Sequence, residues 1–126
     1  MEVKGLKNGS CHCESVEFEV ELPNGFEYLS RCNCSMCARR GAIVTAVSLS
    51  AFRVTKGKDV LSLYQFNTKT AEHYFCSVCG IYTHHKIRSN PNQYSINVAC
   101  IEGVKPFELG SIPTTDGINH SCDSNN

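Results

Sequence analysis

Hydrophobic and polar residues alternate along several short stretches of the chain. The clearest case is residues 15–22, Ser-Val-Glu-Phe-Glu-Val-Glu-Leu, where every second side chain is apolar. A period of two is typical of a β-strand with one buried face, and the Pro-Asn-Gly sequence that follows predicts a turn. Runs rich in β-branched and aromatic residues predict further strands at residues 42–47, 52–55, 60–66, 73–75, 81–87 and 94–98.

Helical patterns are scarce. No stretch of ten or more residues carries a helical stripe, and the best candidate is residues 35–40, one or two turns that Gly41 would end. No repeat, low-complexity tract or linker divides the 126 residues. We therefore expect a single domain over residues 1–126, mainly β with short helical turns only, and a disordered polar tail at residues 121–126.

Composition narrows the classes of function. Twelve basic and twelve acidic residues give a formal net charge of zero, which argues against binding to nucleic acid or to an anionic membrane surface. Hydrophobic residues make up 41% of the chain, but no apolar run approaches the ~20 residues of a transmembrane helix. Residues 1–7 lack the apolar stretch of a secretory signal, so we expect a cytoplasmic protein.

Cysteine is the most informative residue type. The chain holds nine cysteines, an odd number, so disulfides alone cannot account for all of them. In a reducing compartment clustered cysteines more often bind metal, and a secreted disulfide-bonded module is the less favoured alternative. Seven of the nine form three tight groups, at positions 11 and 13, at 32, 34 and 37, and at 76 and 79.

The first and third groups together match a structural zinc site. A Cys-x-x-Cys turn directs both thiols of Cys76 and Cys79 to one point, and Gly80 can supply the positive φ that such turns often need. Cys11 and Cys13 would face the same side of an extended strand. Apparent zinc-binding energies of ~10–16 kcal/mol exceed the net stability of a small domain. Such a site would hold the fold together.

The middle group resembles a catalytic rather than a structural site. Cys32, Cys34 and Cys37 provide three ligands, and catalytic zinc sites commonly have three protein ligands and one open position. Spacing alone does not fix the allocation, because Cys34 and Cys37 could instead pair with Cys76 and Cys79 as a zinc ribbon. An iron–sulfur cluster or a thioredoxin-like redox pair fits these spacings less well.

The three motifs together resemble a known family. Residues 9–13 (Gly-Ser-Cys-His-Cys), 32–37 (Cys-Asn-Cys-Ser-Met-Cys) and 75–83 (Phe-Cys-Ser-Val-Cys-Gly-Ile-Tyr-Thr) are similar to those of the glutathione-dependent formaldehyde-activating enzyme family, whose domain also occurs in centromere protein V. The resemblance extends through residues 97–100 to the Asp-Gly segment at 116–120 and so covers nearly the whole chain. The cysteine signature is specific, whereas the Asp-Gly segment is weak on its own.

The resemblance implies a fold, two cofactor ions and a reaction. It implies a β-tent with a zinc knuckle, and formation or cleavage of the carbon–sulfur bond of S-hydroxymethylglutathione, a lyase-type reaction of glutathione and formaldehyde. A non-catalytic zinc module that binds a protein partner, and an enzyme acting on another thiol or a larger aldehyde, are the alternatives. The implied ligands are Cys11, Cys13, Cys76 and Cys79 for a structural zinc and Cys32, Cys34 and Cys37 for a second, catalytic zinc.

Arginines near the middle cysteines are candidates for substrate binding. Glutathione carries two carboxylates, which guanidinium groups bind bidentately. Arg39 and Arg40 follow Cys37 directly, and Arg31 precedes Cys32. The alternative is that these side chains lie in solvent or neutralise a negatively charged zinc–thiolate cluster.

The histidines and the two isolated cysteines carry weaker signals. His84 and His85 are adjacent on a predicted strand, so only one can face the interior, and a structural role is the expected one. His73 is expected on the surface, and Cys100 as a small buried hydrophobe in a strand. His120, after the Asp-Gly segment, could close over the second zinc and bind substrate.

Overall fold

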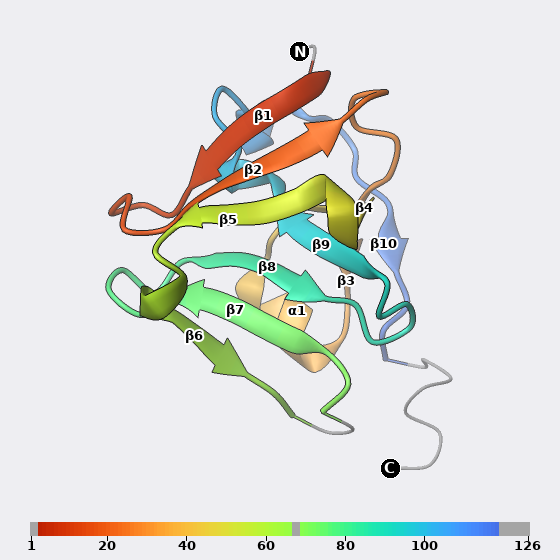
Figure 1. Ribbon diagram of the computed structural model, residues 1–126. Helices are drawn as coiled ribbons and strands as arrows, with labels where there is room; N and C mark the ends of the chain where they lie inside the picture. Colours follow the sequence, from red (N-terminus) through yellow and green to blue (C-terminus); the bar gives the residue numbers. More distant parts are fainter. Residues whose placement is uncertain (1–2, 67–68, 119–126) are drawn as a thin grey trace.

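The computed structural model describes residues 3–66 and 69–118, which form two β-sheets, a short α-helix and several 3-10 turns (Figure 1). Helix α1 spans Ser35–Arg40, and the 3-10 turns are Leu49–Ala51, Lys58–Val60, Val98–Cys100 and Pro106–Glu108. The strands are β1 (Gly5–Ser10), β2 (Glu17–Leu22), β3 (Leu29–Cys32), β4 (Val44–Ser48), β5 (Phe52–Lys56), β6 (Leu61–Tyr64), β7 (Glu72–Cys76), β8 (Tyr82–Lys86), β9 (Gln93–Asn97) and β10 (Thr114–Thr115).

The strands are shared between a small and a large sheet. The small sheet has the order β1-β2-β5, and the large sheet has the order β10-β3-β4-β9-β8-β7-β6. Neighbouring strands are antiparallel except for β10, which runs parallel to β3. In Figure 1 the small sheet lies across the top of the molecule, above β7, β8 and β9, with α1 and β3 behind. The prediction of a mainly β fold is confirmed.

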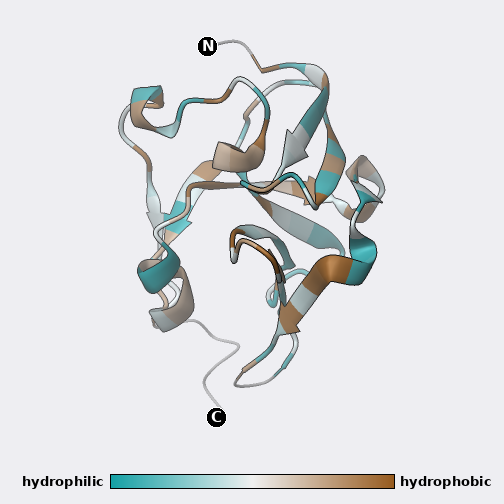
Figure 2. Cartoon of the chain, turned by 90° about the vertical axis from the view of Figure 1, so that its left-hand side faces the viewer, coloured by the Kyte–Doolittle hydropathy of each residue, from teal (hydrophilic) through white to brown (hydrophobic). Residues whose placement is uncertain are grey.

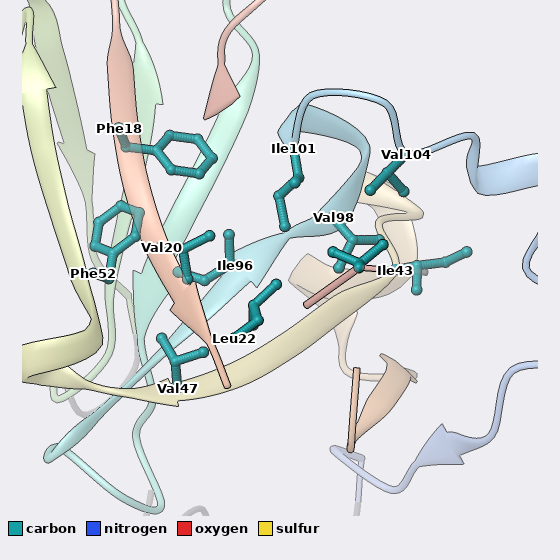
Figure 3. Packing of buried hydrophobic residues seen from close by; sticks show 11 residues of the cluster. Phe18, Val20, Leu22, Ile43, Val47, Phe52, Ile96, Val98, Ile101 and Val104 are labelled. Carbon is teal, nitrogen blue, oxygen red and sulfur yellow. The ribbon is translucent and has the colours of Figure 1, made fainter. Parts of the chain in front are cut away.

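The main core lies between the two sheets. Phe18, Val20 and Leu22 of β2 are buried, and the glutamates that alternate with them are not, as the period-two pattern predicts. Figure 3 shows these side chains directed toward Ile96 and Ile101. Figure 2 shows the same alternation of hydrophilic and hydrophobic positions along the strands. Burial of this apolar face provides the main driving force for the packing of the two sheets.

Most predicted strands are present within a few residues of their expected ends, but β1, β3 and β10 were not predicted. The residues of β1 are Gly-Leu-Lys-Asn-Gly-Ser, in which only Gly9 is buried. This strand pairs with β2 along its whole length, from Gly5 opposite Leu22 to Ser10 opposite Glu17. Backbone pairing rather than a buried side-chain face therefore defines β1.

Helix α1 forms where the sequence predicts it. The Sγ atom of Cys34 caps the helix by accepting a hydrogen bond from the backbone N–H of Cys37. Gly41 ends the helix with φ of 68°, a left-handed conformation that glycine adopts without strain, and its N–H donates to the carbonyl of Cys37. Within residues 3–66 and 69–118, no helix is long and apolar enough to cross a membrane.

The large sheet presents different side chains on its two faces. On β4, Thr45 and Val47 are buried on the side of the core, whereas Val44 and Ala46 line a cavity on the other side. The period of two in a strand produces this division. One face of the large sheet therefore packs against the core, and the opposite face lines the cavity.

The two adjacent histidines of β8 follow the same division. His84 faces the core, with its ring 4.5 Å from that of Phe52 and 4.8 Å from that of Tyr74. Its Nδ1 atom lies 2.8 Å from the hydroxyl of Thr83, and burial lowers its pKa to about 3. His85 faces the cavity. The imidazole of His84 is therefore a neutral part of the core at physiological pH.

The pKa of His84 leads to a prediction about acid stability. Because the folded protein binds this proton less tightly than the unfolded chain, the stabilisation is complete above the unfolded value of 6.5 and is lost as pH falls toward 3. Relative to the His84→Phe variant, the wild type should lose about 2 kcal/mol of unfolding free energy between pH 7 and pH 5. Urea titrations of both proteins across this range measure the difference, which removes any contribution that the two share. Parallel curves would contradict the assignment of a neutral, buried His84.

Candidate metal centres

Four sulfur atoms converge where the turn after β1 meets the β7–β8 hairpin. The cysteines of this group, called cluster 1, are Cys11, Cys13, Cys76 and Cys79, and their sulfurs all lie within 4.8 Å of one another. Cys13 Sγ is 3.7 Å from Cys11 Sγ and 3.7 Å from Cys76 Sγ. A zinc ion with Zn–S bonds of ~2.3 Å requires sulfurs about 3.8 Å apart in a tetrahedron. Cluster 1 therefore has the donor type and the spacing of a four-thiolate metal site.

The local backbone directs these thiols inward. The expectation that Cys11 and Cys13 lie on an extended strand is wrong: they lie on a turn after β1, in which Cys11 N–H donates to Val16 O and Glu14 N–H to Cys11 O. The turn, and not an extended backbone, therefore brings the thiols of Cys11 and Cys13 to the same point. On the hairpin, Gly80 has the predicted positive φ, 81°, and its N–H donates to Cys76 O.

Backbone N–H groups point at the sulfurs of cluster 1. Val16 N–H donates to Cys11 Sγ and Val78 N–H to Cys76 Sγ, each at 3.4 Å. At Cys11 burial outweighs the Val16 donor and raises the pKa to about 11. The pKa of Cys79 falls to about 6, because the N–H groups of Cys13 and Ile81 outweigh its burial. These donors stabilise sulfur in its thiolate form, the form that binds metal.

The middle cysteines form a second group, cluster 2, where β3 passes into α1. Cys32 ends β3, Cys34 caps α1 and Cys37 lies in the first turn of the helix, and their three sulfurs lie within 4.8 Å of one another. Cys34 N–H donates to Cys32 Sγ at 3.5 Å and Cys37 N–H to Cys34 Sγ at 3.3 Å. The structure groups the sulfurs as four and three, so the alternative pairing of Cys34 and Cys37 with the hairpin cysteines is wrong. Each cluster is able to hold a metal ion.

Arg40 lies beside cluster 2. One guanidinium nitrogen donates to Cys37 Sγ at 3.2 Å, a second lies 3.0 Å from His73 Nδ1, and the group is centred 3.6 Å above the ring of Tyr82. Because a guanidinium only donates, His73 Nδ1 accepts, and its proton is on Nε2. The hydrogen bond between Cys37 and Cys32 lowers the pKa of Cys32 to about 5 and raises that of Cys37, while the charge of Arg40 opposes the rise.

A segment from the far end of the chain packs against cluster 2. Asn33 Oδ1 accepts hydrogen bonds from the N–H groups of Gly117 at 2.7 Å and Ile118 at 3.2 Å, and Arg88 donates to Gly117 O at 3.0 Å. A Cβ atom at position 117 would lie 2.5 Å from Cys32 Sγ and 2.7 Å from Cys34 Cβ. Only glycine therefore fits at this contact without displacing the cysteines.

Cluster 2 opens on a cavity of about 390 Å³. All three of its cysteines line the cavity, together with Arg40, Arg88, His73 and His85. The remaining lining residues are Tyr28, Ser30, Ala42, Val44, Ala46, Phe66, Ala71, Ile87, Ser89, Ser95, Thr115, Asp116 and Gly117. Three thiols at the wall of a cavity leave room for a small molecule beside any ion that they hold.

The predicted substrate-binding residues differ in position. Arg40 lines the cavity, but its guanidinium already contacts Cys37 and His73. Arg39 is exposed, donates to Ser35 O at 2.9 Å and lines a neighbouring groove. His120 lies outside the described residues, as does the tail at 121–126.

Sequence reasoning missed or misplaced several cavity residues. The expectation that His73 is on the surface is wrong: it is 4% exposed, because β7 lies between β6 and β8 and Phe66 stacks on its ring. Burial, reinforced by Arg40 and Arg88, lowers its pKa to about 4. Arg88 carried no sequence signal, since it lies in the loop after β8. His85 also lines the cavity, and its Nδ1 atom lies 2.6 Å from the hydroxyl of Tyr82.

Cys100 lies outside both clusters. It is half-buried and belongs to the 3-10 turn at Val98–Cys100, not to a strand as expected. Its Sγ lies 3.6 Å from Tyr82 O, and burial raises its pKa to about 12. The thiol is thus protonated at neutral pH and packs against the edge of the main core, partly and not fully buried.

The fold and the two clusters together define a mainly β domain with a four-cysteine and a three-cysteine candidate metal centre. The sequence model of the glutathione-dependent formaldehyde-activating enzyme family matches residues 6–111. The chain belongs to this family, as its three cysteine motifs predict.

The chain is also similar to a curated protein and to a solved structure. Over 83 residues the chain is 37% identical to a protein of Halomonas elongata that is provisionally named a glutathione-dependent formaldehyde-activating enzyme. That match covers 60% of this chain and 52% of the relative, so the shared region spans about half the length of that protein. A crystal structure of a Rhodobacter sphaeroides protein, a structural genomics target, is 57% identical, with a TM-score of 0.83 over 86% of this chain and 99% of the other.

The packing of Gly117 leads to a prediction about metal binding. The Gly117→Ala variant should bind metal at cluster 2 about tenfold more weakly, because the new methyl group must displace Cys32 or Cys34. Cobalt titrations that follow the sulfur-to-metal absorption bands measure this affinity. Cluster 1 is the internal control, and its occupancy should not change. Equal cobalt affinity of both proteins at both clusters would contradict the packing argument.

Proposed function

We propose that this protein is a zinc enzyme that forms or cleaves the carbon–sulfur bond of an adduct between a thiol and an aldehyde, with glutathione and formaldehyde as the reactants that the family indicates. The observation that supports the proposal best is the position of cluster 2. Its three thiols lie together at the wall of a cavity large enough for a small molecule. Three ligands and an adjacent space are the arrangement of catalytic zinc sites.

Zinc is the metal that the donor sets favour. Four thiolates in tetrahedral spacing select zinc or an iron–sulfur centre, and the 3.7 Å sulfur separations of cluster 1 suit a single zinc ion. We assign Cys11, Cys13, Cys76 and Cys79 to a structural ion and Cys32, Cys34 and Cys37 to a second one, giving two zinc ions per chain.

The second ion would supply an open coordination position that holds the substrate thiol deprotonated and nucleophilic. Arg40 offsets the negative charge of three clustered thiolates and donates directly to one of them, Cys37. Arg40 also fixes the tautomer of His73, whose Nε2–H then remains a neutral donor at the cavity. In the forward reaction sulfur bonds to the carbonyl carbon, the π electron pair moves to oxygen, and the thiol proton ends on that oxygen. Orientation within the cavity supplies the acceleration.

Recognition of the glutathione carboxylates by Arg39, Arg40 and His120 remains a prediction. The contacts of Arg40 favour a role toward the thiolates of cluster 2, which was the alternative considered for it. Arg88 adds a second positive charge to the cavity wall and lies close to cluster 2 through its bond to Gly117. An anionic thiol would be attracted to this end of the cavity.

Serine substitutions should separate the two clusters. Cys34→Ser should lose the zinc ion of cluster 2, and with it all activity, but should retain the ion of cluster 1. It should remain folded, because the three cysteines of cluster 2 lie on one short segment and do not join distant parts of the chain. Cys76→Ser should unfold the domain, because cluster 1 joins two distant segments. Zinc-to-protein ratios by mass spectrometry and thermal unfolding by circular dichroism measure both effects. Cys100→Ser is the matched control and should keep both ions; two retained ions in Cys34→Ser would contradict the assignment.

The reaction itself is tested by NMR exchange between formaldehyde and glutathione. The zinc-loaded wild type should accelerate the exchange above its spontaneous rate, and Cys34→Ser should not. If the fully loaded wild type gives only the spontaneous rate, the protein is instead the non-catalytic zinc module. Unchanged activity in Cys34→Ser would show that any catalysis occurs elsewhere in the protein.

A further inference from the structure

One wall of the cavity, along β4, carries apolar side chains and begins beside cluster 2. Ala42, Val44 and Ala46 occupy alternate positions at and before β4, so the period of a strand places them on one face. Ala71 and Ile87, from the segments flanking β7 and β8, extend the same surface. Methyl groups therefore line the cavity along β4 and again at the ends of β7 and β8, with β9 and its Ser95 between the two patches.

The cavity is much larger than formaldehyde requires. Formaldehyde has two heavy atoms and would occupy little more than the ~30 Å³ of a water molecule. The cavity measures about 390 Å³, which lies within the range of sites for whole organic ligands. Three of the apolar lining residues are alanines, Ala42, Ala46 and Ala71, whose small side chains take up little of this space.

The polar body of glutathione does not match the apolar wall. Glutathione carries two carboxylates and an ammonium group, and burial of a charge without a partner is strongly unfavourable. The charged side chains of the cavity, Arg40 and Arg88 with Asp116 next to Gly117, lie instead at its cluster 2 end, where Arg40 contacts Cys37 and Arg88 contacts Gly117. The peptide part of the thiol then stays at that end, and the apolar space is left for another group.

We propose that the apolar wall binds the substituent of the aldehyde, so that the substrate class is an S-(1-hydroxyalkyl) thiol whose aldehyde carbon carries an apolar chain. This inference rests on the proposed function of cluster 2 and specifies its substrate. The chemistry is unchanged: the thiol adds across the carbonyl, sulfur bonds to carbon and the proton ends on oxygen. Each fully buried methylene strengthens binding by roughly fourfold, so affinity should increase with the length of the apolar chain.

Unreactive thioethers test the wall without turnover. S-methylglutathione and S-hexylglutathione present the same polar body and differ in the chain attached to sulfur. Calorimetry with the zinc-loaded protein should show that the hexyl compound binds at least tenfold more tightly. Equal affinities of the two compounds, or no binding of either, would overturn the inference.

A substitution in the wall shows where the chain binds. Ala46→Phe should fill the space beside β4 and remove the advantage of the hexyl compound, whereas Ala99→Phe, on an exposed position of the 3-10 turn after β9, should leave it intact. Ala46→Leu provides a milder variant, and thermal unfolding verifies that each protein is folded. A hexyl advantage that persists in folded Ala46→Phe or Ala46→Leu would place the chain elsewhere and overturn the inference.

Exchange measurements keep this inference separate from the proposed function. NMR exchange with glutathione is compared for formaldehyde and for hexanal. Acceleration of formaldehyde exchange together with chain-independent binding leaves the proposed function intact and overturns the inference. A chain-dependent affinity with no acceleration of either aldehyde supports the apolar wall as a binding surface and overturns the proposed reaction.

Discussion

The convergence of four sulfurs in cluster 1 is the constraint on which the rest of the structure depends. It joins Cys13 to Cys76, residues that are 63 positions apart, and so fixes the turn between β1 and β2 against the hairpin of β7 and β8. The buried residues around it, Cys11, Val16 and Cys76, form a small apolar cluster separate from the main core. A chain of this size buries limited apolar surface, so a bound ion at this point would add stability that packing alone does not provide.

The large sheet connects this scaffold to the chemistry. Each of its central strands contributes one set of side chains to the core and the alternate set to the cavity, as Val47 and Ala46 of β4 illustrate. The part of the cavity wall that the sheet provides is therefore packed directly against the core, whereas cluster 2 is built at a strand end and a helix cap. A wall fixed by the sheet, with reactive groups at element ends, is a favourable arrangement for positioning a small molecule.

The features that the sequence predicted are those that local spacing determines. The alternation in β2, the helix at α1 ended by Gly41, and the three cysteine motifs at 11–13, 32–37 and 76–79 each depend on residues within a few positions of one another. By contrast β1 and β10 exist through backbone pairing, which leaves no side-chain pattern. The burial of His73 depends on Phe66 and on two neighbouring strands, and the role of Gly117 depends on cysteines more than eighty residues earlier. Such contacts arise only from the assembled topology.

The parallel pairing of β10 with β3 has a consequence for biosynthesis. The three thiols of cluster 2 leave the ribosome together, but the backbone that packs against them and donates to Asn33 Oδ1 is made later, since Gly117 follows Asn33 by 84 positions. Until this segment has been made and has docked, the three thiols would lack the Gly117 backbone that packs against Cys32 and Cys34. A nonsense truncation just upstream of that stretch would leave the main strand pairings available and yet deprive the reactive triad of its cover.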